Sequence, residues 1–512
     1  MKKAILFLVM VILALPVMNP SFIFAQAKDG GTATIGIPND IAGVDPHKHY
    51  AFIDGQIWGL MCENLVTAMK NHQPGPALAE TWKMSGDARE YTFSLRKGVK
   101  FHNGRELTAE DIKWNFDRMM DPKTASGMKT RLEKVEAVTV VDKYTVRFRL
   151  RIPSGGFLAF FYGASVQSPI MAKESVNSDG TITHPIGTGP FEFVEWVPHD
   201  HIKVKKFKNY WQKGLPHLDE ILLKVVPDEV SRLTAVRAGD LDFSYMLPIE
   251  EVSKSMKTPS KDFSLGVLPG GTNYFCFNCS TKPFSDPKVR QAVFYAVNRE
   301  EFLEANTFGH GQVANQFFPA GHPWHSDVNS PKQDLARAKQ LLTEAGYPNG
   351  FDTTMLTDNT QNILLTSAQI VQAQLKKIGI NVKLDVKDFT THIAQMRKAE
   401  FQITNMWAAA CADPDVYYPM ALSSQGAYNW GKWKNPEMDE VLNKGASAPT
   451  MEERKRYYTR AVSLLVNEGP MVYVHTVPLA YGMRSRLKGF EPAIGLLFLR
   501  SDGGMQFAYI DK

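Results

Sequence analysis

The sequence predicts a mixed α/β fold with more than one domain. Strand and helix patterns alternate along the 512 residues without a low-complexity linker or an internal repeat. A chain of this length is expected to form two or three domains of about 100 to 200 residues each. Hydrophobic residues make up 44% of the chain and charged residues 22%, which excludes a disordered chain, a coiled coil and a collagen.

The clearest helix-and-strand unit lies between residues 364 and 386. Apolar side chains recur there at spacings of four, three, four and three residues, at Leu364, Ala368, Val371, Leu375 and Ile378. Gly379 then ends the helix, and the apolar side chains of Val382, Leu384 and Val386 alternate as in a strand. This pattern predicts a helix packed on a sheet, which is α/β or α+β construction.

The first 27 residues are typical of a secretory signal peptide. Lys2 and Lys3 precede an apolar run from Ala4 to Met18, and Ala25-Gln26-Ala27 offers a cleavage site with small residues. A membrane anchor is the alternative, but the run of about 15 residues is shorter than the about 20 that span a bilayer. No Cys lies near the cleavage site, so we expect a soluble exported protein without a lipid anchor.

The part of the chain that follows contains two strands and a helix. Residues 90–96 and 144–150 alternate apolar and polar side chains, as half-buried strands do. Between them, Thr108 can cap a helix over residues 107–116, with Asp111 three residues further on in a variant of the capping box.

Neither the charge nor the cysteine content of the chain indicates a nucleic-acid partner or a disulfide scaffold. The 58 basic and 53 acidic side chains give a net charge of +5 without a long basic run, so we expect no nucleic-acid partner.

The four cysteines, Cys62, Cys276, Cys279 and Cys411, are too few for a disulfide scaffold. Cys276 and Cys279 lie in an extended run and not at a helix N-terminus that would stabilise a thiolate. We therefore expect a structural disulfide from Cys276 or Cys279 to Cys411, not redox chemistry.

Sequence signatures of enzymes, of nucleotide binding and of metal sites are missing. The chain contains no GxSxG elbow, no Walker phosphate loop, no GxGxxG after a strand and no HExxH helix. The close pairs His47/His49, His199/His201 and His322/His325 lack a third ligand at a recognised spacing, so we expect no metal. An exported enzyme would need a nucleophile with a base or paired carboxylates. Neither stands out, so we expect no catalysis and no cofactor.

Two loops combine aromatic residues with small neighbours. The first spans residues 405–418 with Trp407, and the second spans 427–433 with Trp430. Such loops suit the wall of a closed pocket, because rings supply apolar area and backbone groups supply hydrogen bonds. The same rings could fill a domain core, and composition leaves both alternatives open.

A series of motifs extends along the chain. The longest region begins at Pro76-Ala-Leu-Ala-Glu80-Thr-Trp82 and continues through Tyr91-Thr-Phe93, Phe101-His102-Asn-Gly104 and Leu107-Thr108-Ala-Glu-Asp111-Ile112. The others are Val44-Asp45-Pro46-His47, Gly187-Thr188-Gly189-Pro190-Phe191, Gly239-Asp240-Leu241-Asp242, Val289-Arg290-Gln291-Ala292, Gly346-Tyr347-Pro348 and Asn435-Pro436-Glu437-Met438-Asp439. In this order they resemble the ABC-transporter solute-binding proteins of the peptide/nickel family, family 5, over essentially the whole mature chain.

The resemblance implies a three-lobed periplasmic-binding-protein fold of type II, cluster C, with hinge closure between two main lobes. It divides the chain into lobe I (28–68, 186–273 and 478–512), an inserted lobe II (69–185) and lobe III (274–477). The implied function is that of a monomeric periplasmic receptor. It would enclose a peptide or another small molecule between lobes I and III and deliver it to the membrane subunits of an ABC permease.

One implied contact position departs from peptide-binding relatives. In those proteins an Asp three residues after the loop Trp pairs with the α-amino group of the peptide. With Asp413 and Pro414 aligned to the acid and proline that follow, the position after Trp407 is Ala410. A buried ammonium group without its partner is strongly disfavoured. The resemblance thus implies that a peptide held by its termini is a poor ligand, unless Asp413 takes the role.

The other contact positions implied by the resemblance are aromatic and mostly uncharged. They are Tyr50, Phe52, Tyr245, Asn429, Trp430 and Tyr473, in addition to Trp407. Such a pocket suits a ring, a sugar face or an apolar peptide side chain. The family base rate favours a peptide. The alternative is a non-peptide ligand: an aromatic compound, an oligosaccharide or a nickel chelate, for which Met246, His49 and His475 lie near contact positions.

Overall fold

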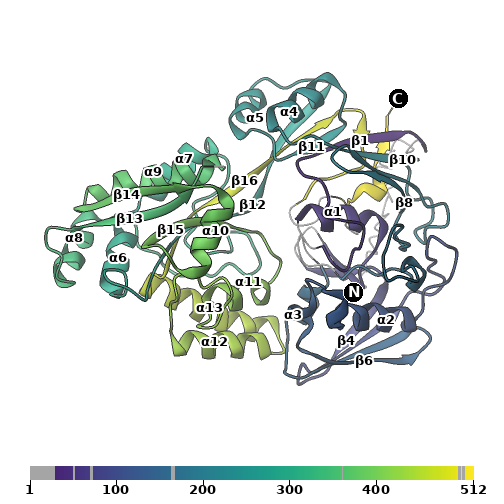
Figure 1. The fold of residues 1–512 in the computed structure, drawn as a ribbon, viewed down its shortest axis with the longest axis horizontal. Helices are drawn as coiled ribbons and strands as arrows, with labels where there is room; N and C mark the ends of the chain where they lie inside the picture. Colours follow the sequence, from purple (N-terminus) through teal and green to yellow (C-terminus); the bar gives the residue numbers. More distant parts are fainter. Residues whose placement is uncertain are drawn as a thin grey trace, which may run out of the picture.

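A ten-stranded mixed sheet runs through the molecule (Figure 1). This computed structural model describes residues 29–49, 52–69, 73–162, 168–359, 361–493, 498 and 502–511. The strands follow the order β14-β13-β15-β12-β16-β11-β1-β10-β9-β8. They are β1 (Thr32–Ile37), β8 (Phe191–Val197), β9 (His201–Lys206), β10 (Glu220–Val225), β11 (Phe243–Tyr245), β12 (Phe263–Phe277), β13 (Phe351–Asp358), β14 (Ile380–Lys387), β15 (Ile403–Ala409) and β16 (Met471–Arg484). The predicted α/β class is confirmed.

Two long strands, β12 and β16, join the two halves of the molecule that Figure 1 shows on the left and on the right. They pair antiparallel from Phe263 opposite Arg484 to Cys276 opposite Met471. Near the middle, Pro269 faces Pro478, and the register shifts after Pro269. Because proline has no N–H to donate, the hydrogen-bond ladder is weakest at this point. The ribbon is therefore expected to bend most easily there.

The left half, which we call lobe III after the predicted division, packs around one core formed by residues between Tyr274 and Val474. Strand β13 lies between β14 and β15 and runs parallel to both. The helices of this lobe are α6 (Pro287–Ala296), α7 (Arg299–Thr307), α8 (Leu335–Glu344), α9 (Asn362–Lys376), α10 (Phe389–Lys398), α11 (Pro414–Leu422), α12 (Pro436–Ser447) and α13 (Met451–Glu468). The predicted helix and strand between residues 364 and 386 are α9 and β14 and are confirmed.

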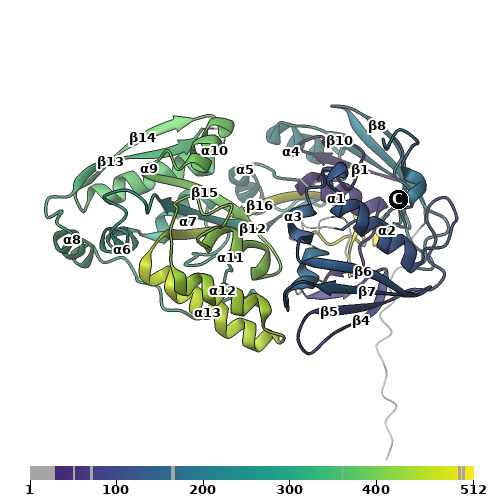
Figure 2. The same ribbon diagram turned by 60° about the horizontal axis from the view of Figure 1, so that its bottom comes forward.

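Lobe II has a sheet of its own with the order β4-β5-β7-β6, at the lower right of Figure 2. Its elements are β3 (Pro74–Pro76), β4 (Ala79–Met84), β5 (Glu90–Leu95), α2 (Ala109–Met120), η1 (Pro122–Thr124), α3 (Lys129–Leu132), β6 (Val135–Asp142), β7 (Thr145–Leu150), η2 (Phe157–Phe160) and η3 (Lys173–Ser175). Strand β2 (Val66–Ala68) lies just before the predicted start of this lobe at residue 69 and pairs with β3. The predicted strands at 90–96 and 144–150 are confirmed. The predicted cap of α2 is also present, because the Asp111 carboxylate accepts a hydrogen bond from the Thr108 backbone N–H at 2.9 Å.

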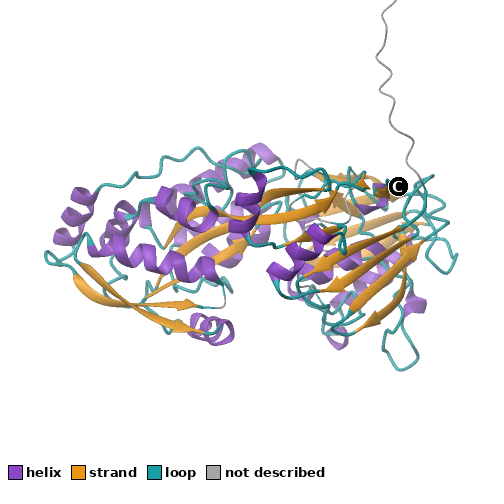
Figure 3. Cartoon of the chain, turned by 90° about the horizontal axis from the view of Figure 1, so that it is seen from above, coloured by secondary structure: helices purple, strands orange, loops and turns teal. Residues whose placement is uncertain are grey.

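Lobe I is assembled from three separate stretches, since its core takes residues from 33–62, 171–245 and 487–510. Besides its strands of the large sheet it contains α1 (Phe52–Met61), α4 (Glu229–Ala238), α5 (Ile249–Met256), β17 (Leu487–Lys488), η4 (Met505–Phe507) and β18 (Tyr509–Ile510). Buried contacts attach it to lobe II: Arg118 forms an ion pair with Asp45 at 2.7 Å. Lobes I and II thus make up one half of the molecule, beside lobe III (Figure 3). The predicted lobe boundaries stay predictions.

The expected disulfide is not formed, because all four cysteines are free thiols. The strand register gives the reason. Cys276 lies opposite Thr404, whereas Ala410, next to Cys411, donates its N–H to Gly270. Six residues of extended chain separate Gly270 from Cys276, about 20 Å. Cα atoms joined by a disulfide lie less than about 7 Å apart.

The predicted signal peptide, residues 1–27, lies outside the described residues and stays a prediction. Within the described ranges, the structure contains no helix with the length and apolar character that crossing a membrane requires.

Candidate ligand-binding site

Two cavities meet at the segment that follows β15, and Ala410 and Cys411 line both. The first, which we call the hinge cavity, has a volume of about 450 Å³. Its walls are the β12–β16 ribbon around Pro269 and Pro478 and the loop that contains residues 317–322. The second, which we call the aromatic cavity, has a volume of about 440 Å³.

The aromatic cavity is formed mainly by lobe III and in part by lobe II. Arg131 of α3 and Tyr162 reach it from lobe II. The rings that line it are Tyr162, Tyr274, Phe389, Trp407, Tyr417, Tyr428 and Trp430. Since both halves of the molecule contribute, the shape of this cavity depends on how the halves are placed.

The wall shared by the cavities is positioned by strand pairing. Trp407 lies opposite Asn273 and Ala409 opposite Gly271 in the β12–β15 pair. A Cβ atom on Gly271 would lie 2.2 Å from the Ala408 carbonyl oxygen, so the strands approach this closely only because residue 271 is a glycine. The small side chains of residues 408–410 leave room beside the Trp407 ring.

Aromatic contacts organise the site. The indole N–H of Trp407 donates a hydrogen bond to the Gln361 side-chain oxygen at 2.7 Å, which fixes the ring. Tyr428 stacks on Trp430 with ring centroids 5.3 Å apart. Tyr417 of the aromatic cavity stacks on Phe317 of the hinge cavity with a centroid distance of 4.0 Å. Both alternatives that the sequence left open for the loops at 405–418 and 427–433 hold in part. Trp407 and Tyr428 line the cavity, Tyr418 and Trp433 belong to the lobe III core, and Tyr417 and Trp430 do both.

The linings of the two cavities contain arginines and histidines but no acidic side chains. Arg131 and Arg397 line the aromatic cavity, and His310 and His322 line the hinge cavity. Among the residues that the structure describes, no Asp or Glu belongs to either lining. A buried ammonium group would find no counter-charge here, so its desolvation would not be compensated.

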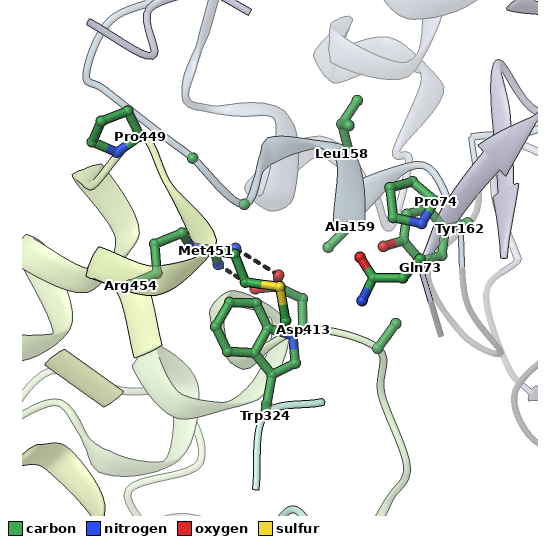
Figure 4. A pocket seen from close by; sticks show the side chains of 13 residues that line it. Gln73, Pro74, Leu158, Ala159, Tyr162, Trp324, Asp413, Pro449, Met451 and Arg454 are labelled. Atoms are coloured by element: carbon green, nitrogen blue, oxygen red, sulfur yellow. Dashed lines mark hydrogen bonds and ion pairs between the residues drawn. The ribbon is translucent and has the colours of Figure 1, made fainter. Parts of the chain in front are cut away.

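Asp413 lies in a third, smaller cavity of about 150 Å³ between lobes II and III (Figure 4). The Arg454 guanidinium donates a hydrogen bond to its carboxylate at 2.8 Å and forms an ion pair with Asp415 at 3.1 Å. Burial acts to lower the pKa of Arg454, but the two carboxylates outweigh it and raise that pKa. Figure 4 shows Trp324 beside this pair, and the guanidinium carbon lies 4.7 Å from its ring centroid. Asp413 is therefore already engaged by a buried cation.

The other predicted contact residues divide into four groups. Trp407, Ala410 and Trp430 line the aromatic cavity. Asn429 is buried, and its amide donates to the carbonyls of Ser423 at 3.0 Å and Trp433 at 2.6 Å, so it holds the loop together. Tyr245 and Tyr473 are fully buried in the cores of lobes I and III. Tyr50 and the side chain of Phe52 lie outside the described part. Ligand contact by these residues stays a prediction.

Residues that could hold a metal ion do not gather in the described part of the chain: no group of three or more His, Cys, Asp or Glu side chains is present there. His475, considered for a nickel chelate, is buried in lobe III. One ring nitrogen of His475 is 2.9 Å from the Thr476 carbonyl and the other 3.1 Å from the Asn306 amide. Burial lowers its pKa to about 4.

Sequence reasoning did not identify Arg131, Arg397, Tyr162 and Phe389 as lining residues. Arg131 belongs to the four-residue helix α3, and Arg397 to the last turn of α10. Neither follows a recognised motif, so only the packing of lobe II against lobe III brings the two arginines to one cavity.

Comparisons with known proteins agree with this architecture. Residues 73–429 match the sequence model of the bacterial extracellular solute-binding proteins, family 5. The glutathione-binding protein GsiB of Pectobacterium atrosepticum is 28% identical over 501 residues, which cover 94% of each chain.

Two solved structures show similar folds. The periplasmic binding protein AgaA from A. tumefaciens R10, in complex with agropinic acid, has a TM-score of 0.78 at 28% identity, over 94% of this chain and 99% of its own. The periplasmic binding protein DppA from Helicobacter pylori, in complex with the peptide STSA, has a TM-score of 0.78 at 26% identity, over 95% and 99%. The ligands named in these two structures belong to different chemical classes.

Proposed function

The chain belongs to family 5 of the bacterial extracellular solute-binding proteins, and from this premise we propose that it is the periplasmic receptor of an ABC importer. In this role it encloses a small organic solute and delivers it unchanged to the permease subunits in the membrane. It performs no catalysis. The signal peptide predicted at residues 1–27 supplies the export that this role requires.

The observation that carries the proposal is the pair of cavities beside the β12–β16 ribbon. Volumes of about 450 and 440 Å³ suit a small organic ligand. Together the linings take residues from all three predicted lobes: Pro269 from lobe I, Arg131 from lobe II and Trp407 from lobe III. A solute held there contacts both halves of the molecule, so it favours the arrangement in which the halves are close.

The chemistry of the cavities bears on which solute is bound. The family base rate favours a peptide, and the similar proteins include a peptide binder, a glutathione binder and a binder of agropinic acid. Ala410, which stands where peptide binders carry an Asp, lines both cavities, and Asp413 is paired with Arg454. These contacts favour a ligand that is not held by a free α-amino group, either a peptide anchored in another way or a non-peptide solute.

Native mass spectrometry of the mature protein, followed by thermal-shift screening of peptides, sugars, aromatic acids and metal chelates, tests this proposal. A solute at 100 times its dissociation constant adds about 2.7 kcal/mol to the free energy of unfolding. Trp407→Leu should weaken binding of the solute that is found, whereas Trp82→Leu, a change in β4 of lobe II, should not. Absence of any saturable ligand, or chemical conversion of a bound one, would contradict the receptor function.

A further inference from the structure

A series of polar side chains in lobe III leads from the buried face of α10 to the wall of the aromatic cavity. It begins at His392 of α10 and continues through Asp358, the last residue of β13. It ends at Gln361, which precedes α9 and accepts the indole N–H of Trp407. We propose that His392 is a positioning residue for the ligand site: it fixes the Trp407 ring through this series, and it holds α10 in place as a second part of the cavity wall. This inference rests on the proposed function, because it concerns the cavity in which the solute is bound.

Helix α10 presents one face to the cavity and another to the protein interior. Phe389, Ile393 and Arg397 recur at a spacing of four residues, so they lie on one face of the helix, and all three line the cavity. His392 and Met396 are the buried residues of this helix. The contacts of these two side chains therefore decide where the cavity face of α10 lies.

The His392 ring joins α10 to two strands of the large sheet. Its side chain is fully buried, and so are those of Thr404 and Asp358. Nε2 of the ring lies 2.8 Å from the Thr404 hydroxyl oxygen on β15, and Nδ1 lies 3.9 Å from a carboxylate oxygen of Asp358. The carboxylate favours the tautomer with the proton on Nδ1, so Nε2 accepts the hydrogen bond of the Thr404 hydroxyl. Because a buried polar group that loses its partner costs free energy, these contacts fix the ring and, with it, α10.

Asp358 carries the connection from one face of the sheet to the other. Thr404 and Trp407 are three residues apart on β15, so their side chains point to opposite faces. Strand β13 lies next to β15, and the Asp358 carboxylate at its end accepts a hydrogen bond from the Gln361 backbone N–H at 3.2 Å. The Gln361 side-chain oxygen in turn accepts from the Trp407 indole at 2.7 Å. His392 on one face and Trp407 on the other are thus linked around the end of a single strand.

The charge on His392 depends on pH. Burial lowers the pKa of the ring, and the negative charge of Asp358 acts against this effect. Of the strands beside the ring, β13 contributes the charged Asp358 and β15 the uncharged Thr404. The other charged groups of α10 lie at its ends, Asp388 before the first turn and Arg397 and Lys398 in the last. The ring is therefore neutral at about pH 7 and gains a proton only below its usual pKa of about 6.5. A charged ring attracts the Asp358 carboxylate more strongly, at the expense of the hydrogen bond to Gln361.

A buried histidine can also serve packing alone, and its loss would then loosen the lobe without a specific effect on the ligand site. The two roles differ in whether His392 and Gln361 act on the cavity through the same contacts. Effects that pass through one network of contacts are not additive in a double-mutant cycle, whereas independent effects add.

Titration with N-phenyl-1-naphthylamine, an uncharged aromatic fluorescent probe, tests the inference at the aromatic cavity. We expect saturable binding that His392→Gln and Gln361→Met each weaken about 5- to 10-fold, as expected for the loss of one hydrogen bond. The double variant should be weakened no more than about 10-fold, whereas independent effects would multiply to about 25- to 100-fold. Gln372→Met is the matched control, because it removes a hydrogen bond from α9 to the Val382 carbonyl and does not line the cavity. Its affinity for the probe should change less than about 2-fold.

A pH profile provides a readout that a packing role would not change. Between about pH 7 and 5, the affinity of the unmodified chain for the probe should decrease as His392 gains a proton, whereas that of His392→Gln should stay constant. Met396→Ala loosens the packing of α10 without removing the ring that titrates. This variant should keep the decrease with pH, and its effect should add to that of Gln361→Met.

Three results would overturn the inference: an unchanged probe affinity in a folded His392→Gln variant, additive effects in the double variant, or the same pH profile with and without the ring. If circular dichroism showed that His392→Gln does not fold, Gln361→Met and the unmodified chain would decide. An unchanged affinity in Gln361→Met, or a constant affinity of the unmodified chain between about pH 7 and 5, would then refute the positioning role.

The receptor function is decided by separate measurements. Absence of saturable probe binding would remove the aromatic cavity as a binding site, and the role of His392 with it. A solute found in the native mass spectrum or in the solute screen would still leave the receptor in place. No solute of any class would remove the receptor itself.

Discussion

A single glycine in lobe II should control how readily the two halves of the molecule meet. Gly155 precedes η2, and its backbone N–H donates a hydrogen bond to the Ala446 carbonyl of α12 in lobe III at 2.8 Å. A Cβ atom at this position would lie 2.0 Å from the Ala448 carbonyl oxygen, whereas ordinary contact begins at 3.4 Å. Gly155→Ala must therefore push the loop away from lobe III and break that hydrogen bond.

The size of the effect follows from these two contacts. Overpacking of a close contact costs about 1 to 3 kcal/mol, and the hydrogen bond contributes about 0.5 to 1.5 kcal/mol. We expect a total of about 2 to 4 kcal/mol against the arrangement in which lobes II and III touch. A tenfold change corresponds to about 1.4 kcal/mol, so the population of that arrangement should fall about 30- to 700-fold relative to the separated one. The apparent affinity for a solute that needs this arrangement should weaken, up to the same factor.

Small-angle X-ray scattering and solute titration measure this change together. Gly155→Ala should have a larger radius of gyration than the unmodified chain at the same solute concentration, chosen so that it saturates the unmodified chain but not the variant. Gly86→Ala is the matched control, since it lies in the same lobe and its added Cβ has no neighbour within 4 Å. If both variants showed the same radius of gyration and the same affinity, the contact at Gly155 would have no part in closure, and our reasoning would be refuted.

Two further changes test the site and its pH dependence. Ala410→Asp should have a melting temperature within a few degrees of that of the unmodified chain. It should bind peptides with a free amino terminus at least about 10-fold more tightly. No gain in affinity across a peptide library would show that residue 410 does not face the ligand. His102 is neutral in the folded chain, because its Nε2–H donates to the Gly189 carbonyl at 3.1 Å, its Nδ1 accepts from the Gly187 N–H at 3.2 Å, and burial lowers its pKa to about 4. This pKa lies below the value of about 6.5 in the unfolded chain. The contribution of His102 to the free energy of unfolding is therefore complete above pH 6.5. It decreases as the pH falls towards 4, by up to about 1.4 kcal/mol per pH unit. Urea unfolding of His102→Gln between pH 7 and 4.5 should show a slope shallower by that amount, and an unchanged slope would argue against a neutral buried ring.

The sequence was informative where a local pattern determines a local structure. The apolar spacing that ends at Gly379 defined α9 and β14, and the Thr108 and Asp111 pair marked the start of α2. The aromatic residues around Trp407 and Trp430 suited either a pocket wall or a core, and the structure places both of these tryptophans at a cavity.

Features that depend on packing between distant segments could not be predicted from the sequence. Cys276 lies on β12 and Cys411 follows the adjoining strand β15, but only the register shows how far apart they are along the strand direction. Tyr245 and Tyr473 were predicted as contact residues from the family resemblance, but both side chains are buried in the cores of their lobes. The sequence gives no signal that Arg131 lines a cavity, because this cavity forms where α3 meets a lobe that begins more than 100 residues later.

The discontinuity of lobe I has a consequence for the order in which this chain acquires its structure. The lobe I core includes Leu487, Phe490, Met505 and Ile510, so it cannot be completed before the last part of the chain is present. Lobe III is one continuous stretch of chain from Tyr274 to Val474. The chain enters this lobe through β12 and leaves it through the neighbouring strand β16, so lobe III can fold earlier. During synthesis from the N-terminus, lobe I therefore cannot complete its core until the end of the chain has been made. A truncation of the last 30 residues should abolish lobe I while lobe III still folds.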